Sequence, residues 1–379
     1  MRKRKIAVVV ETVNAYGRGI ISGISDSLRH QPACAVYFEE RTLDMGLPGW
    51  LNDWHGDGII VRDRFGKCYT EAQKTGAVVV DLSEQQIPGS LAVYTDNAAI
   101  ARMAAYHLHS CQFNHYAYVG IRQLQFSCQR RDAFLRAVGI CPVYDFPDEV
   151  RAGPAWEDEQ TDFIEWLAKL PKPVGIMTCN DRVGMNVLKG CLLAGFAVPE
   201  QVAVIGVDND EVYCSLSNPP MTSVEQNTRR IGYDACELLF RILDGKAPRY
   251  RTLAIPPIRV VRRKSTDVLA VPDRIVAQAI KIIREYACAG IAPAEVAARL
   301  NVSLRTLERR FLRFSRRTPW KEISETRIFA ACELLIETDQ TIENIAHKVG
   351  FASVAHFNRM FEEVIGNRPT LYRRINQKP

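Results

Sequence analysis

The sequence lacks an apolar run long enough to cross a membrane or to serve as a secretory leader. Its first apolar segment, 6–10, stops at Glu11, whereas a leader needs about 7–15 apolar residues and a membrane helix about 18 or more. It also lacks a C-x-x-C motif, and its 11 cysteines are scattered singly. Such a pattern is typical of free thiols in a reducing compartment rather than of disulfides or structural zinc. We therefore expect a cytoplasmic protein with no metal site and no membrane association.

Low-complexity segments are also absent, and a composition of 47% hydrophobic and 24% charged residues is that of folded domains. The 379 residues are enough for two or three domains. Positive charge is concentrated at one end. From Pro272 onward there are 18 Lys and Arg against 12 Asp and Glu, so this part carries the whole net charge of +6. A neutral body followed by a basic domain is typical of proteins that bind nucleic acid.

Short β-branched strands alternate with amphipathic helices over about the first 260 residues. The expected strands are 5–11, 35–39, 58–61, 77–81, 115–120, 173–178 and 202–207, and the expected helices are 97–110, 125–138, 156–170, 182–194 and 227–243. This alternation predicts parallel sheets covered by helices on both faces. Its length favours two α/β lobes with a cleft between them over one continuous sheet.

Polar and aromatic side chains follow several of these strands or begin the next helices, at the edge where parallel sheets bind ligands. Carboxylates and amides can bind neighbouring hydroxyl groups, and an aromatic ring can cover the apolar face of a sugar. Asp and Asn at such positions are also good helix N-caps, so capping stays the alternative for each. The candidate sugar-binding residues are Asn14, Tyr16, Asp96, Phe126, Arg130, Asp181, Asp208 and Gln226.

A glycine-containing stretch, 17–23, offers a competing interpretation. It follows the first strand and precedes acidic residues at 39 and 40, as in a dinucleotide-binding turn. Its spacing is G-x-G-x-x-x-G rather than G-x-G-x-x-G, and 14–16 lengthen the turn. We therefore expect these glycines to permit a tight turn and close helix packing, with no cofactor bound and no catalytic residues.

The basic part carries two copies of a helix-turn-helix pattern, at 295–311 and 344–361. Each copy has a small Ala in the first helix and a turn residue suited to the left-handed conformation, Asn301 or Gly350. Each then has a serine that caps a second helix with an apolar face. A long helix over 320–337 joins the two copies. Side chains expected to contact DNA are Arg305, Thr306, Glu308, Arg309, His356, Asn358 and Arg359.

Residues of about 273–374 resemble the DNA-binding domain of AraC/XylS-type regulators. The resemblance rests on Arg327-x-x-x-Ala331-x-x-Leu334-Leu335 and on a closing run that includes Gly350-Phe351 and Phe357-x-Arg359-x-Phe361. The body resembles the sugar-binding core of LacI/GalR regulators and periplasmic binding proteins, through 95–97, 180–181, 204–208 and 222–226. These likenesses imply a periplasmic-binding-protein-like core over 1–262, a linker over 263–271 and an all-α DNA-binding domain over 272–379.

The combined resemblance implies a homodimeric, sugar-responsive transcription activator. Its expected partners are double-stranded operator DNA, RNA polymerase and a pentose effector, xylose or a close relative. Two alternatives remain open at this stage. One is a nicotinamide-dependent oxidoreductase with an appended nucleic-acid-binding domain. The other is a constitutive DNA-binding protein whose core only dimerises.

Overall fold

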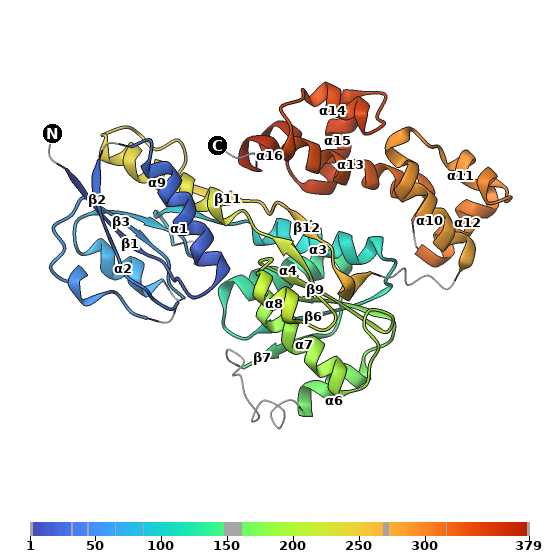
Figure 1. Cartoon of the computed structure of the whole chain (residues 1–379), viewed down its shortest axis with the longest axis horizontal. Helices are drawn as coiled ribbons and strands as arrows, with labels where there is room; N and C mark the ends of the chain where they lie inside the picture. Colours follow the sequence, from blue (N-terminus) through green and yellow to red (C-terminus); the bar gives the residue numbers. More distant parts are fainter. Residues whose placement is uncertain are drawn as a thin grey trace. The chain divides into compact units, whose positions relative to one another are not determined.

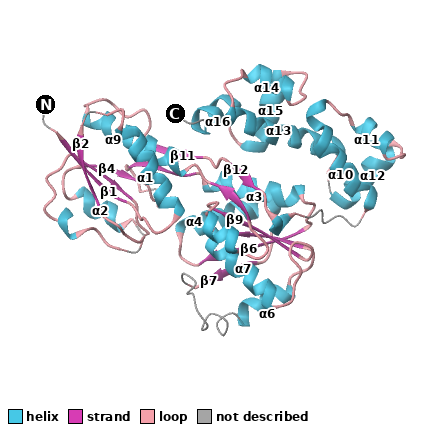
Figure 2. Ribbon diagram, in the orientation of Figure 1, coloured by secondary structure: helices cyan, strands magenta, loops and turns pink. Residues whose placement is uncertain are grey.

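The computed structural model describes residues 3–31, 33–43, 45–64, 66–85, 87–147, 161–267, 273–315 and 317–376. The chain forms two units, drawn in Figures 1 and 2. Unit 1 consists of Met1–Asn97, Gln123–Gln129 and Gln226–Ile258, and unit 2 of Ala98–Arg122, Arg130–Glu225 and Arg259–Pro379.

Unit 1 is built on a six-stranded sheet with strand order β11-β5-β4-β3-β1-β2, and all of its pairings are parallel. The strands are β1 (Arg4–Val9), β2 (Cys34–Phe38), β3 (Gly58–Val61), β4 (Val78–Asp81), β5 (Leu91–Thr95) and β11 (Thr252–Ile255). Its helices are α1 (Ala15–Leu28), η1 (Gly49–Leu51), α2 (Lys67–Gln73) and α9 (Thr228–Leu243). The central strands β1 and β3 are almost wholly buried, as expected for a sheet with helices on both faces.

Helices α1 and α9 pack with their backbones in contact, and glycines make this possible. A Cβ atom on Gly23 would lie 1.8 Å from the carbonyl oxygen of Arg229, and one on Gly232 would lie 1.9 Å from that of Ile20. Gly17 and Gly19 lie within the first turns of α1, and each is equally crowded. The prediction of close helix packing is confirmed, but the expected tight turn is wrong, because the whole stretch 17–23 is part of α1.

The α/β part of unit 2 has a second six-stranded sheet, with strand order β12-β10-β9-β8-β6-β7. The strands are β6 (His115–Ile121), β7 (Val143–Phe146), β8 (Val174–Thr178), β9 (Val202–Val207), β10 (Thr222–Glu225) and β12 (Arg259–Val261). Only the β10–β12 pairing is antiparallel. The helices are α3 (Asn97–Ser110), α4 (Gln125–Val138), α6 (Thr161–Lys169), α7 (Asp181–Leu193) and α8 (Glu211–Leu216). The first turn of α4, up to Gln129, belongs to unit 1.

The helical part of unit 2 contains two small cores joined by one helix. Its elements are α10 (Arg274–Tyr286), η3 (Ala287–Ala289), α11 (Pro293–Arg299), α12 (Leu304–Ser315), α13 (Pro319–Glu337), α14 (Ile342–Lys348), α15 (Val354–Ile365) and α16 (Pro369–Asn376). Leu307 and Phe311 fill the first core, and Phe357 and Phe361 fill the second. Helix α13 contributes buried side chains to both, so the predicted connecting helix is confirmed.

The predicted fold class is confirmed, with two α/β sheets followed by a helical region. Part of the segment expected to be a linker is packed into unit 2. Residues Lys264–Thr266 form the helix η2, in which the buried Ser265 hydroxyl donates to the Val204 carbonyl at 2.6 Å. Residues 268–271 lie outside the described residues, as do 156–160 of the helix expected over 156–170. Within the described parts of the chain, no helix combines the length and hydropathy needed to cross a membrane.

Candidate functional site

Tyr16, Thr95 and Gln226 form a buried hydrogen-bonded chain in unit 1. The Tyr16 hydroxyl lies 2.8 Å from the Thr95 hydroxyl, which donates to the side-chain oxygen of Gln226 at 2.8 Å. These three side chains come from α1, the end of β5 and the residue after β10. The structure therefore brings together two residues that the sequence predicted, Tyr16 and Gln226. Burial raises the pKa of Tyr16 above its usual value, and the nearby Glu84 carboxylate raises it further, so the phenol stays protonated.

A buried ion-pair network adjoins this chain, and its residues are not among those predicted from the sequence. The Arg62 guanidinium pairs with Glu11, lies 3.9 Å from a Glu84 oxygen and stands 4.4 Å above the Tyr16 ring. Burial raises the pKa of Glu11, while the charge of Arg62 acts in the opposite direction. Arg62 directly follows β3, and Glu11 lies two residues after the end of β1, so the rule that found the other candidates applies to them too.

Asn14 and Asp96 lie where chain segments enter helices. The Asn14 side chain accepts a hydrogen bond from the Gly17 amide at 2.8 Å and caps α1, which is the capping alternative for this residue. Asp96 precedes α3 and is half-buried. The adjacent Asn97 side chain donates to Gln129 at 2.8 Å, which in turn donates to the Glu84 carbonyl at 3.0 Å.

Asp181 is the centre of a second cluster, in unit 2. One of its oxygens accepts from the Ser223 hydroxyl at 2.6 Å, and the other accepts from the Asp210 amide at 2.8 Å and from the Cys214 thiol. Burial raises the pKa of Asp181 well above its usual value, and the Asp208 carboxylate raises it further. Because both oxygens already have donors within the chain, Asp181 supports the turn that carries Asp208.

That turn adopts an unusual backbone conformation. Asp208 and Asn209 have φ angles of 116° and 53°, in the region that non-glycine residues rarely adopt. Arg263 holds the turn by donating to the Asn209 side chain at 2.8 Å, and Ser223 accepts from the Asn209 amide. Strain of about 1–3 kcal/mol per residue persists where the surroundings enforce it, often at functional sites. Asp208 is half-buried beside Asp181.

Phe126 and Arg130 lie one turn apart on α4. Phe126 is half-buried and Arg130 is buried, with its guanidinium donating to the Cys179 carbonyl. Cys179 follows β8, so Arg130 lies at the same strand edge as Asp181 and Asp208.

The two helix-turn-helix units have the geometry that the sequence predicts. Asn301 and Gly350 have φ angles of 54° and 91°. Ser303 accepts from the Thr306 amide at 3.1 Å, and Ser353 accepts from the His356 amide at 3.4 Å, so both serines cap as expected.

The predicted DNA-contacting side chains lie at the beginnings of α12 and α15. Four of them are exposed, namely Arg305, Glu308, Arg309 and Arg359, while Thr306, His356 and Asn358 are half-buried. The Thr306 hydroxyl lies 2.8 Å from the Ser303 hydroxyl and takes part in the cap. Exposed Arg and half-buried Asn side chains on such helices suit the edges of guanine and adenine in the major groove.

Arg327 of α13 contacts both helix-turn-helix motifs. Its guanidinium donates to the carbonyls of Ala287 at 2.8 Å and Ile291 at 3.3 Å, beside the first unit. A Cβ atom on Gly350, in the turn of the second unit, would lie 3.0 Å from Arg327 Nε. Through these contacts, Arg327 fixes the position of the turn at Gly350 relative to the first helix-turn-helix motif.

Comparison with known proteins gives two family matches. Residues 105–266 match the periplasmic binding protein-like domain, and residues 296–375 match a helix-turn-helix domain. The xylose operon regulatory protein of Haemophilus influenzae is 31% identical over 97% of this chain and 98% of its own. That of Escherichia coli K12 is 29% identical over 100% and 98%. The solved structure of the xylose-binding transcription activator xylR aligns over the whole of both chains, with 27% identity and a TM-score of 0.62.

Proposed function

Because this chain belongs to the family of xylose operon regulatory proteins and is a sugar-responsive transcription regulator, we propose that its effector is a pentose, with xylose as the first candidate. The observation that carries the proposal is the strained turn at Asp208 and Asn209, held in place at a strand end by Asp181, Ser223 and Arg263. Because backbone strain is often kept at functional sites, we expect this strained turn to present the Asp208 carboxylate to a ligand. Carboxylates accept hydrogen bonds from the hydroxyl groups of sugars.

Within unit 1, the sugar-binding groups are the chain that contains Tyr16 and Gln226, together with Asp96. Within unit 2, they are Asp208 and Arg130, with Asp181 as the support of the turn. Asn14 acts through its cap of α1, and the Phe126 ring offers an apolar surface to the sugar.

The DNA-binding partner is double-stranded operator DNA, read by α12 and α15. We propose that the protein acts as a homodimer, that it contacts RNA polymerase as an activator, and that it works in the cytoplasm. Its relatives are named regulators, and we propose that this chain acts by binding alone, without catalysis.

A thermal-shift titration of the full chain with xylose, arabinose, ribose, glucose and NAD tests the effector. A ligand at about 100 times its Kd adds roughly 2.7 kcal/mol of stability, so xylose should raise the melting temperature measurably. Asp208→Asn is the informative variant because Asn resembles Asp in shape and in its tolerance of positive φ, so the substitution removes the charge with little change at the turn. It should weaken xylose binding at least tenfold while the melting temperature without sugar stays close to that of the parent.

The control is Glu200→Ala, which removes an exposed carboxylate of unit 2 away from the turn. If Asp208→Asn responds to xylose as the parent does, Asp208 serves only the backbone. A shift with NAD and with no sugar would contradict the proposed effector altogether.

A further inference from the structure

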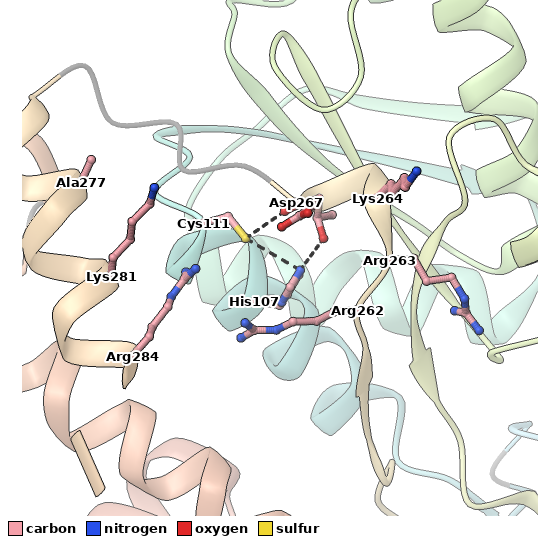
Figure 3. A pocket seen from close by; sticks show the side chains of 10 residues that line it. His107, Cys111, Arg262, Arg263, Lys264, Asp267, Ala277, Lys281 and Arg284 are labelled. Carbon is pink, nitrogen blue, oxygen red and sulfur yellow. Dashed lines mark hydrogen bonds between the residues drawn. The ribbon is translucent and has the colours of Figure 1, made fainter. Parts of the chain in front are cut away.

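A basic cavity lies within unit 2, between the end of α3, the residues after β12 and helix α10 (Figure 3). Its volume is about 650 Å³, within the range of about 300–1,000 Å³ that is typical of small-molecule sites. Five cationic side chains line it and only one acidic side chain, Asp267, does so. No predicted sugar-binding or DNA-contacting residue lines this cavity.

Three of the cationic groups converge. Figure 3 shows Lys281 and Arg284 extending from α10 toward the end of α3, with the Arg262 guanidinium extending toward Arg284. The other two, Arg263 and Lys264, extend to the opposite side. Arg263 is already engaged there by Asn209 and by the Met221 carbonyl.

None of the three converging cations forms an ion pair with a described acidic side chain. Arg284 donates to the Ser110 carbonyl at 2.6 Å, and no described carboxylate forms an ion pair with it, with Arg262 or with Lys281. Asp267 also lines the cavity, and no ion pair joins it to these cations in the described part of the chain.

The two titratable groups on α3 that face this cluster do not neutralise it. The pKa of His107 is lowered well below its usual value, chiefly by burial and then by the charges of Arg262 and Arg284. Its Nε2 lies 2.8 Å from the Thr266 hydroxyl. Burial raises the pKa of the Cys111 thiol, which therefore stays protonated. The buried Glu322 carboxylate of α13 pairs with Arg317 and also interacts electrostatically with Arg284 and Arg262, so it balances only part of the positive charge of the cavity.

We propose that this cavity binds a small phosphate-bearing metabolite, with Arg262, Lys281 and Arg284 as the phosphate ligands. Arginine presents a planar fork that matches phosphate oxygens, and lysine adds a compact charge. The volume exceeds what a phosphate group alone needs, so a phosphate ester fits better than the inorganic ion. This ligand is a second one, distinct from the proposed pentose.

The position of the cavity gives the ligand a regulatory consequence. Lys281 and Arg284 belong to the first helix of the DNA-binding region, whereas Arg262 follows the last strand of the sheet in unit 2. A phosphate held by all three links α10 to that sheet. The phosphate ligand changes operator affinity only if its affinity differs between the arrangement of the chain that can bind DNA and the arrangement that cannot.

The test is a thermal-shift titration of the full chain with inorganic phosphate, ribose 5-phosphate and ribose, at constant ionic strength maintained with chloride. We expect saturable stabilisation by ribose 5-phosphate, weaker stabilisation by phosphate and none through this cavity by ribose. The double variant Arg262→Gln/Lys281→Gln should weaken the ribose 5-phosphate affinity at least tenfold. Both residues are exposed, so the fold should persist, and far-UV circular dichroism checks it.

Arg274→Gln is the matched control, because Arg274 is an exposed cation on the same helix but does not line the cavity. Its affinity for ribose 5-phosphate should match that of the parent. The response to xylose should be unchanged in every variant, which separates this proposal from that of the effector.

Two results would overturn the proposal. One is that neither phosphate compound stabilises the parent in a saturable way, or that ribose 5-phosphate stabilises the double variant as strongly as the parent. The other is that operator DNA competes with phosphate and that the double variant shows a shallower dependence of operator binding on salt. The cations would then contact the DNA backbone.

Discussion

Asp81, at the end of β4, is a buried carboxyl group whose titration should affect stability. Burial raises its pKa to about 7, against hydrogen bonds from the Ser83 amide and hydroxyl that lower it. Between the unfolded pKa of about 4 and 7, the folded chain holds a proton that the unfolded chain has lost. The stability that this group contributes is therefore present at low pH and is lost as the pH rises through that window.

Asp81→Asn should remove this dependence. As the pH rises from 4 to 8, the free energy of unfolding of the variant should increase relative to that of the parent. The change in this difference should be no more than about 4 kcal/mol for a pKa shift of this size. Urea denaturation of parent and variant across that range measures the difference. Parallel curves at every pH would contradict the assignment.

Gly350 and Asn301 occupy the same place in the two helix-turn-helix turns, and they should respond differently to substitution. Gly350→Ala places a side chain at a φ of 91° and against Arg327. It should lower the free energy of unfolding by roughly 1–3 kcal/mol and weaken operator binding. Asn301→Gly relieves a left-handed residue and should change stability by less than about 0.5 kcal/mol.

Denaturation midpoints and operator affinity of both variants provide the measurement. Equal losses from the two substitutions would mean that the turns are stabilised by something other than backbone conformation.

At the scale of single residues, the sequence predicts conformation better than contact partners. The left-handed turn residues and both serine caps follow from local rules, and all are present. The pairing of Arg62 with Glu11 joins residues 51 positions apart, and no local rule reports it. For Asn14, the sequence left both capping and sugar binding open, and the structure shows that its side chain caps α1.

At the scale of elements, the length of the apolar pattern decides what can be predicted. The strands at 58–61 and 202–207 and the helices at 97–110 and 125–138 agree with their predictions to the residue. The missed elements are short, and they include α2, α8, β5, β7, β10 and the two strands β11 and β12 on either side of 256–258. Strands of three or four residues carry too little periodicity, and proline argues against a strand.

The exposed face of α12 provides a prediction about base recognition. Arg305 and Arg309 lie one turn apart on this face. A base-contacting Arg→Ala substitution should cost about 1–3 kcal/mol of operator binding and relax specificity at one base pair. A phosphate contact should instead weaken all operator variants alike and reduce the salt slope by about 1.

Arg313→Ala is the control on the same helix, since Arg313 is exposed but lies in its second half, over the Phe314 ring. Fluorescence anisotropy with a panel of single-base operator variants separates the two roles. If neither Arg305→Ala nor Arg309→Ala alters affinity, α12 does not enter the major groove.

At the scale of the whole chain, the sequence predicts that the sugar-binding core precedes the DNA-binding region. It does not predict which contacts hold the two together. Within unit 2, the Tyr106 ring of α3 stacks on Phe329 of α13 with ring centroids 3.9 Å apart. Arg284 of α10 binds the Ser110 carbonyl at the end of α3. These contacts join residues far apart in the sequence, and they offer a second route of communication beside the segment at 268–272.

Coupling between sugar and DNA requires that xylose distinguish DNA-competent from DNA-incompetent arrangements, because tight binding alone shifts no equilibrium. By thermodynamic reciprocity, operator DNA must raise xylose affinity by the factor by which xylose raises operator affinity. We expect a coupling free energy of about 1–3 kcal/mol, measured as operator affinity with and without saturating xylose at one salt concentration. Flexible residues inserted between Ala270 and Val271, rather than at the buried Ser265, should weaken the coupling and leave both separate affinities nearly unchanged. If the lengthened chain responds as strongly as the parent while Tyr106→Ala does not, the signal passes through α3 and the short connection carries none of it.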